Sequence, residues 1–247
     1  MKNILRTIWS LYTFVVLAFV VIYTSIIVFI TTLLFGKKGK KFCLFVCEHI
    51  SCPIICFFSF IFIKKIGRHH IKKGEGYVFI CNHNSNYDIF INSAAYPMHS
   101  VFTFLSKIEL AKVPFFGIIA KNLAVLVDRS SMESRRSSFR YMKEVLNEGI
   151  SIWIYPEGTR NKTEEDLLDF QIGAFKLAID MKIPIIVNTL VGVKNINNPN
   201  RALDMWPGVV YSYFEEPIDT SNMTAADIRG MKEQIVQTMK MRINAHK

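Results

Sequence analysis

The sequence predicts an α/β fold in which a mixed sheet is flanked by helices, preceded by a hydrophobic helical membrane element. Two observations predict it. From about residue 77 onward, short β-branched and aromatic runs alternate with amphipathic runs of helical period. Before that, residues 7–35 form a run of 29 positions without a charge. We therefore expect an N-terminal membrane-anchoring helical region over residues 1–73 and a domain that contains the sheet over residues 74–247.

The uncharged run is the first predicted element. It exceeds the roughly 20 residues that a helix needs to span hydrocarbon, and it is too long for the apolar region of a cleaved secretory signal. Basic residues flank it on both sides, namely Lys2, Arg6, Lys37, Lys38, Lys40 and Lys41. This distribution predicts a membrane segment with the following chain on the cytoplasmic side.

A second apolar stretch covers residues 42–63, and Glu48, His49 and Pro53 interrupt it. Because the proline divides the stretch into two pieces too short to span alone, we expect an interfacial or re-entrant helix pair. A hairpin of two spans is the alternative. Either arrangement would hold the domain of residues 74–247 beside the bilayer.

The charge of the chain points to its partners. Formal net charge is +10, and up to Lys73 eleven Lys and Arg face a single acidic residue, Glu48, whereas the remainder carries nineteen of each sign. The excess basic residues flank apolar stretches and do not form a recognition helix or a basic aromatic sheet. We therefore expect anionic lipid headgroups, and not nucleic acid, as the partner.

Strands and helices follow from periodicity along the rest of the chain. Helices are expected over residues 132–148, with an apolar inner face, and over residues 224–244. Strands are expected over residues 77–81, 101–105, 124–127, 151–155, 185–190 and 209–214.

The first motif follows the strand at residues 77–81 and contains His83 and Asp88. Residues five apart on one helix point about 140° away from each other, so this pair cannot meet on a continuous helix. They meet if His83 lies in the turn after the strand and Asp88 opens the next helix. A histidine oriented in this way can accept the proton of an attacking hydroxyl.

The second motif follows the strand at residues 151–155 and reads Pro156-Glu157-Gly158-Thr159-Arg160. Proline and glycine end the strand sharply and leave the polar residues at its carboxyl end, where α/β sheets bind ligands. Arg160 can bind a phosphate through two hydrogen bonds, and Thr159 can donate from its hydroxyl. Together the motifs predict acyl transfer onto a phosphorylated alcohol.

Over about residues 76–216 the chain resembles the glycerolipid acyltransferase family. The two motifs match its first and third blocks, and residues 107–117 with Asp128-Arg129 resemble the second block. The resemblance implies a direct transfer in which His83 deprotonates the acceptor hydroxyl and Asp88 orients the imidazole. It also implies that seven residues contact substrate: Asn82, Lys107, Arg129, Glu157, Gly158, Thr159 and Arg160. For Glu157 we expect either a bond to a glycerol hydroxyl or an ordering of the neighbouring loop.

The expected reaction is transfer of a fatty acyl group from acyl-CoA or an acyl carrier protein to 1-acyl-sn-glycerol 3-phosphate, which forms phosphatidic acid. Glycerol 3-phosphate or another lysophospholipid are alternative acceptors, and a noncatalytic membrane-binding protein is the alternative from another class. A thiolate leaving group needs no metal, so we expect no metal and no cofactor. Cys43, Cys47, Cys52 and Cys56 lie in an apolar stretch, where cysteine behaves as a small apolar residue.

Overall fold

The centre of the protein is a seven-stranded sheet of strand order β1-β7-β6-β2-β5-β3-β4. The computed structural model describes residues 2–128, 130–201 and 204–246. All neighbouring strands run parallel except β6 and β7, so the predicted mixed sheet is confirmed. The strands are β1 (Ile61–Ile66), β2 (Val78–Cys81), β3 (Phe102–Lys107), β4 (Val125–Val127), β5 (Ser151–Ile154), β6 (Ile185–Val191) and β7 (Gly208–Phe214).

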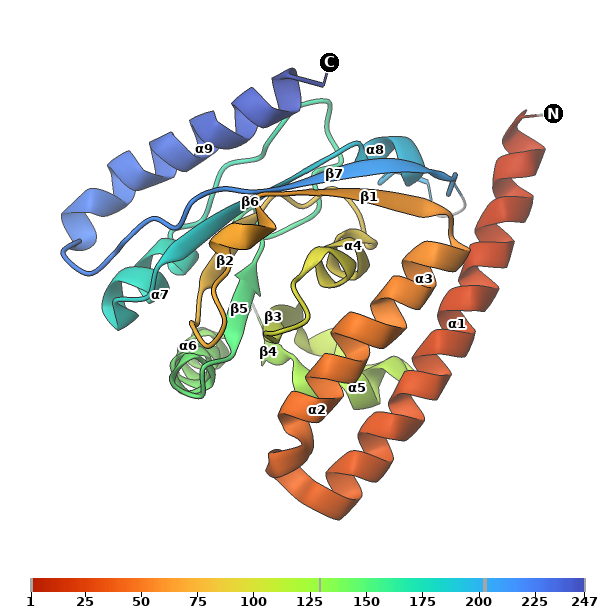
Figure 1. Cartoon of the computed structure of the whole chain (residues 1–247), viewed down its shortest axis with the longest axis horizontal. Helices are drawn as coiled ribbons and strands as arrows, with labels where there is room; N and C mark the ends of the chain where they lie inside the picture. Colours follow the sequence, from red (N-terminus) through yellow and green to blue (C-terminus); the bar gives the residue numbers. More distant parts are fainter. Residues whose placement is uncertain (1, 129, 202–203, 247) are drawn as a thin grey trace.

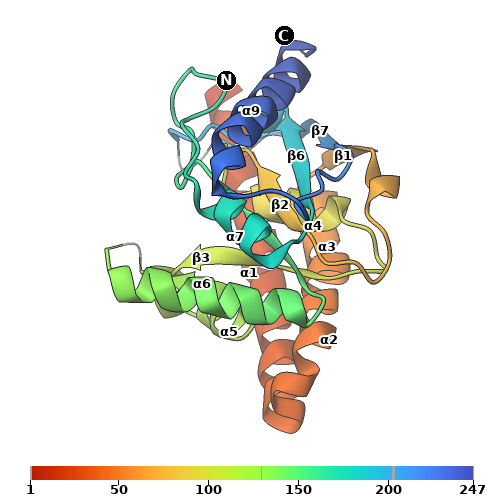
Figure 2. The ribbon, with the colours of Figure 1, turned by 90° about the vertical axis from the view of Figure 1, so that its left-hand side faces the viewer.

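Helices cover both faces of the sheet (Figures 1 and 2). One face packs against α5, α6, α7 and α9, and the other packs against α3, α4 and the first half of α1. The helices are α1 (Lys2–Phe35), α2 (Lys40–Val46), α3 (Cys52–Phe58), α4 (Asp88–Ala95), α5 (Phe116–Leu123), α6 (Met132–Asn147), α7 (Gly173–Met181), α8 (Val193–Ile196) and α9 (Ile228–Asn244). The helices expected near residues 132–148 and 224–244 are confirmed as α6 and α9, the latter preceded by a 3₁₀ turn at Ala225–Asp227.

Residues 2–58 form a helical hairpin that lies along the rest of the protein. Helix α1 turns back at Gly36–Gly39, and α2 and α3 return beside it (Figure 1). Gly39 is required at the turn, because a Cβ there would lie 2.6 Å from the Thr31 methyl group. Pro53 does not split the returning arm into separate pieces. A π-helical turn at Cys47–Ser51 joins α2 to α3, and the proline occupies the first turn of α3, where its missing N–H is least costly.

The prediction of helix through residue 63 was wrong. Helix α3 ends at Phe58, and residues 61–66 form β1, which pairs with β7 near the other end of the chain. Lys64 and Lys65 resemble the basic residues that follow a membrane-associated helix, but they are exposed residues of an edge strand of the sheet. The domain boundary expected between residues 73 and 74 stays a prediction. Strand β1 of the sheet precedes that boundary in the sequence.

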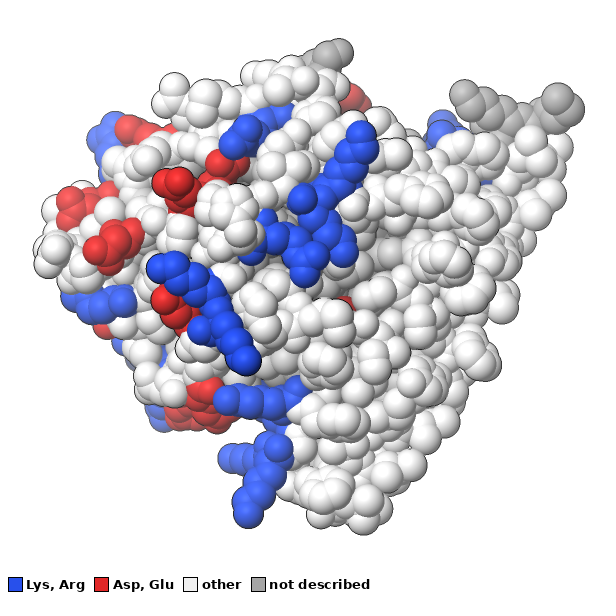
Figure 3. All heavy atoms as spheres, in the orientation of Figure 1, with Lys and Arg blue, Asp and Glu red and all other residues white. Residues whose placement is uncertain are grey.

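The outer side of the hairpin is apolar. In Figure 3 the part of the surface over α1 and α3 is almost free of charged atoms, whereas blue and red atoms gather over the opposite part. Phe14, Phe19 and Leu33 are each more than 60% exposed. Within Ile4–Phe58 an 18-residue window has a mean hydropathy of 2.8, and 28% of that window is buried. Apolar surface of this extent marks a binding face, and its composition is that of a membrane contact.

Candidate active site

Both motifs lie at one edge of the sheet because β2 and β5 are parallel neighbours. Ile80 pairs with Ile154, so the two strands end at the same level. The segment after β2 carries His83, and the segment after β5 carries Glu157. Strand β3 runs parallel on the other side of β5 and ends at Lys107, an exposed residue at the same edge.

His83 and Asp88 meet as the sequence predicted. Asp88 is the first residue of α4, and its Oδ2 lies 2.7 Å from Nδ1 of His83. The same oxygen accepts the backbone N–H groups of Asn84 at 2.7 Å and Ser85 at 2.8 Å. Three donors and the positive end of a helix stabilise the carboxylate, although its side chain is fully buried. The His83 side chain is 23% exposed, so Nε2 is the ring nitrogen available to a substrate.

Glu157 ties the two motifs together. Its Oε1 accepts the backbone N–H of His83 at 2.7 Å, and its Oε2 accepts the N–H of Leu168 at 3.0 Å. The residue is 5% exposed, and burial raises the pKa of its carboxyl against the lowering effect of these two donors. In return, the carbonyl of His83 accepts the N–H of Asn161 at 2.6 Å. These contacts are of the loop-ordering kind, and a bond from Glu157 to a glycerol hydroxyl stays a prediction.

The remaining residues of the second motif form the outer part of the site. Gly158 has a φ of 70°, which favours glycine, and its N–H donates to the Tyr155 carbonyl to close the turn after Pro156. Thr159 is exposed and Arg160 is half-buried. Both therefore lie where a ligand at this edge of the sheet can reach them.

Two of the residues expected to contact substrate are Asn82, which is buried, and Arg129, which lies outside the described residues. Asn82 is fully buried, its amide donates to the Leu190 carbonyl at 2.9 Å, and its side-chain oxygen accepts the Leu190 N–H at 2.8 Å. Asn82 therefore joins the end of β2 to β6, and its expected substrate contact stays a prediction.

Sequence reasoning missed the side chains that pack behind His83. The Tyr155 ring stacks on the His83 imidazole, and the Tyr155 hydroxyl accepts from the amide of Asn92 at 3.1 Å. On the other side of the loop, the Ser85 hydroxyl donates to the Asn197 side chain at 2.6 Å. Asn92 lies four residues after Asp88 and thus on the same face of α4, a spacing that could have indicated its place.

Comparison with known proteins shows the family of this chain. A profile of the acyltransferase family matches residues 62–190. The chain is 32% identical over 169 residues to the 1-acyl-sn-glycerol-3-phosphate acyltransferase of Haemophilus influenzae, an alignment that covers 67% of this chain and 68% of the relative. This protein belongs to the acyltransferase family.

Other members of the acyltransferase family match in sequence and in fold. The 1-acyl-sn-glycerol-3-phosphate acyltransferase of Saccharomyces cerevisiae is 30% identical over 72% of this chain and 60% of its own length. The crystal structure of the 1-acyl-sn-glycerophosphate (LPA) acyltransferase PlsC from Thermotoga maritima superposes with a TM-score of 0.82 over 99% of this chain and 97% of that one, at 20% identity. The fold, including the N-terminal helices, is therefore shared.

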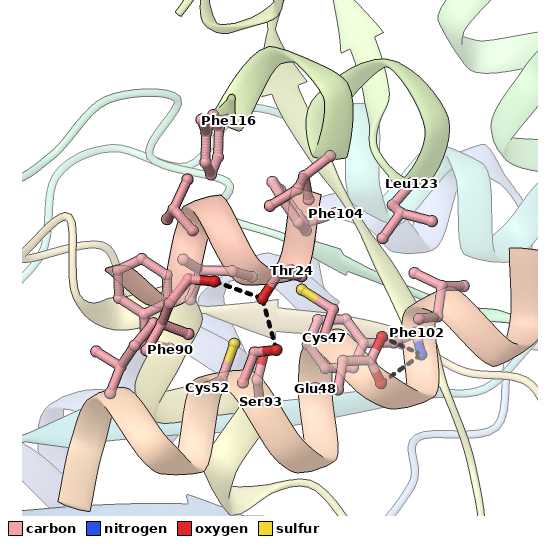
Figure 4. Close-up of a pocket in the computed structure, with 17 residues that line it drawn as sticks. Thr24, Cys47, Glu48, Cys52, Phe90, Ser93, Phe102, Phe104, Phe116 and Leu123 are labelled. Carbon is pink, nitrogen blue, oxygen red and sulfur yellow. Dashed lines mark hydrogen bonds between the residues drawn. The ribbon is translucent and has the colours of Figure 1, made fainter. Parts of the chain in front are cut away.

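A cavity of this acyltransferase lies between the hairpin on one side and α4, β3 and α5 on the other (Figure 4). Its volume is about 40 Å³, and its lining is mostly apolar. Ile89 and Phe90, the two residues after Asp88, form part of its wall and connect it to the loop that carries His83. At the π-helical turn the Glu48 carboxylate accepts the backbone N–H of Phe102 at 3.1 and 3.2 Å.

Proposed function

We propose that this protein transfers a fatty acyl group from an acyl thioester to the free hydroxyl of 1-acyl-sn-glycerol 3-phosphate, forming phosphatidic acid. The observation that carries the proposal is the His83 imidazole held by the buried Asp88 carboxylate at 2.7 Å, at a sheet edge that also presents Arg160 and Thr159. The relatives named 1-acyl-sn-glycerol-3-phosphate acyltransferase support the choice of acceptor.

The reaction is a single displacement with no acyl-enzyme. Nε2 of His83 takes the hydroxyl proton while the acceptor oxygen attacks the thioester carbonyl carbon, and the Asp88 carboxylate stabilises the imidazolium. The C–O bond forms as the C–S bond breaks, and the imidazolium then gives its proton to the departing thiolate. A base placed in this way contributes roughly 10²–10⁴-fold to the rate.

The substrate groups have separate places. Arg160, Thr159 and Lys107 at the rim supply charge and donors for the acceptor phosphate, together with Arg129, for which a phosphate contact is proposed from the sequence. The apolar residues that line the cavity beside Ile89 and Phe90 offer a contact for part of a fatty acyl chain, because burial of each CH₂ group stabilises by about 0.8 kcal/mol.

The apolar outer side of the hairpin holds the enzyme at the membrane that contains its lipid acceptor. The basic residues near both ends of α1 then contact anionic headgroups, with the catalytic domain on the cytoplasmic side, where acyl-CoA and acyl carrier protein are found. Nucleic acid has no part in this function.

The test is acyl transfer from a labelled acyl thioester to lysophosphatidic acid in vesicles, with His83→Ala as the comparison. Phosphatidic acid should form with the parent and fall by at least about 10²-fold in the variant, while thermal unfolding shows that both are folded. Product with glycerol 3-phosphate or another lysophospholipid, but not with lysophosphatidic acid, would reassign the acceptor. Vesicle binding without transfer to any acceptor would favour a noncatalytic role.

A further inference from the structure

An aromatic ring lies flat against the base. The centroids of the Tyr155 ring and the His83 imidazole are 4.3 Å apart, with 22° between the planes. Tyr155 directly follows β5, and β5 pairs in parallel with β2, so the sheet itself brings the two rings together. We propose that Tyr155 is a positioning residue whose ring fixes the plane of the catalytic imidazole and so directs Nε2 at the acceptor hydroxyl. This inference rests on the proposed function, because the role of His83 as base belongs to it.

Asn92 holds Tyr155 in place from behind. The Asn92 amide donates to the Tyr155 hydroxyl at 3.1 Å and approaches the Cys81 sulfur at 3.5 Å, and the side chain is fully buried. Since Asn92 follows Asp88 by four residues, both project from the same face of α4. Helix α4 therefore supports the imidazole twice, at Nδ1 through Asp88 and at the ring face through Asn92 and Tyr155.

A hydrogen bond at Nδ1 restrains the imidazole at one atom, and combined changes of its χ1 and χ2 angles can still tilt the plane of the ring. Contact along a whole ring face removes this freedom. The geometric demand is strict, because a base must lie about 2.6–3.2 Å from the proton it takes, and a misplacement of about 1 Å can cost about 10²-fold in rate.

The ring is also suited to the charge that forms on the base. Burial raises the pKa of the Tyr155 hydroxyl well above its ordinary value, and the nearby Cys81 and Asp88 raise it further, so the ring stays neutral. A neutral aromatic face attracts a cation stacked on it. The contact therefore strengthens when His83 becomes an imidazolium and favours the transition state over the resting enzyme.

Two substitutions separate the ring from its hydroxyl. Tyr155→Phe keeps the stacked ring and loses only the hydrogen bond from Asn92, so we expect kcat to fall by no more than about threefold. Tyr155→Leu removes the ring but leaves an apolar side chain, and we expect kcat to fall about 10–100-fold while KM for the acyl thioester and for lysophosphatidic acid stays within about twofold. If Tyr155→Leu does not fold, as judged by thermal unfolding, Tyr155→Met replaces it, because its flexible side chain fills irregular space.

A spectroscopic measurement tests the contact independently of activity. In ¹³C-histidine-labelled protein, the His83 ring protons, identified with His83→Gln, should show an upfield ring-current shift and cross-relaxation to the Tyr155 ring. Both features should persist in Tyr155→Phe, apart from changes in the tyrosine resonances, and the upfield shift should be lost in Tyr155→Leu.

The outcomes separate the two proposals. An unchanged kcat in Tyr155→Leu, an equal loss in Tyr155→Phe, or a rise in KM without a fall in kcat would each overturn the positioning role. If the parent forms no phosphatidic acid, the proposed function fails, and the NMR measurement alone tests the inference. A His83 ring that shows neither the upfield shift nor the cross-relaxation in the parent overturns it. An upfield shift that is present in the parent and in Tyr155→Phe but lost in Tyr155→Leu supports it.

Discussion

The loop that carries His83, residues 82–87, and the helical hairpin are built in opposite ways. In the loop, the polar groups that matter are fixed several times over, since Asp88 Oδ2 accepts three donors and the backbone of His83 is bonded on both sides. The hairpin instead exposes a broad apolar side, and its polar contacts with the rest of the protein are spread out, as in the hydroxyl of Ser25 on the Phe115 carbonyl and the amine of Lys41 on the Glu148 carbonyl. In the loop, the proposed chemistry depends on the position of the His83 side chain to within about an ångström. In the hairpin, membrane contact depends on the total exposed apolar area.

The largest effect is expected from Asp88→Asn. The neutral amide can keep the backbone bonds to Asn84 and Ser85 but loses the charge that stabilises the imidazolium and can favour the wrong tautomer of His83. We expect kcat to fall about 10²–10⁴-fold with vesicle binding unchanged. Steady-state kinetics and vesicle sedimentation measure the two quantities. A variant with parental kcat would remove Asp88 from the mechanism.

Glu157→Gln should have the next largest effect. Glutamine offers one carbonyl oxygen, so either His83 or Leu168 loses the acceptor for its buried N–H. We expect the free energy of unfolding to fall by about 1–3 kcal/mol and kcat to fall about tenfold, as for a residue that orders the loop around the base. Denaturant unfolding and kinetics check this. A large rise in the KM for lysophosphatidic acid with unchanged stability would instead indicate a direct substrate contact.

The contrast also explains what could be predicted from the sequence. The pairing of His83 with Asp88 is local, because the end of the strand, the turn and the start of the helix all lie within a few residues of each other in the sequence. The same holds for β2 to β7, whose runs alternate with helices. Strand β1 pairs with residues about 145 positions away, and the stacking of Tyr155 on His83 depends on β5 lying beside β2. No local pattern encodes such neighbours, so tertiary structure was needed to find them.

On the hairpin we expect a loss of membrane affinity with little change in catalysis. Phe19 is 74% exposed on α1, and Phe19→Ser removes apolar area that the bilayer would bury. Binding to acidic vesicles should weaken about 10–100-fold, from about 1.5–3 kcal/mol for a buried Phe, while kcat in detergent stays the same. Met241→Ser on α9, an exposed apolar position away from the hairpin, is the control. Equal weakening by both variants would show that the hairpin is not the membrane-binding face.

The smallest effect is expected at the tip of the hairpin. The Lys40 amine donates to the Tyr141 hydroxyl at 2.9 Å and lies over its ring, in an exposed contact. Lys40→Ala should lower the free energy of unfolding by less than about 1 kcal/mol, measured by denaturant unfolding in detergent. A loss several times larger would mean that the tip is a principal attachment of the hairpin and would weaken the contrast between the two regions.

The pairing of β1 with β7 has a consequence for biosynthesis. The apolar hairpin and β1 precede the strand that completes this edge of the sheet, Gly208–Phe214, by about 145 residues, so the ribosome makes them earlier. Pairings between such distant segments form slowly, and incomplete chains expose apolar surface until the pairing forms. A nascent chain therefore carries its apolar hairpin while the intervening residues are made, before the sheet edge next to it can close. Early contact of that element with lipid would shield it during this interval, so delivery to the membrane and completion of the fold are parts of one process.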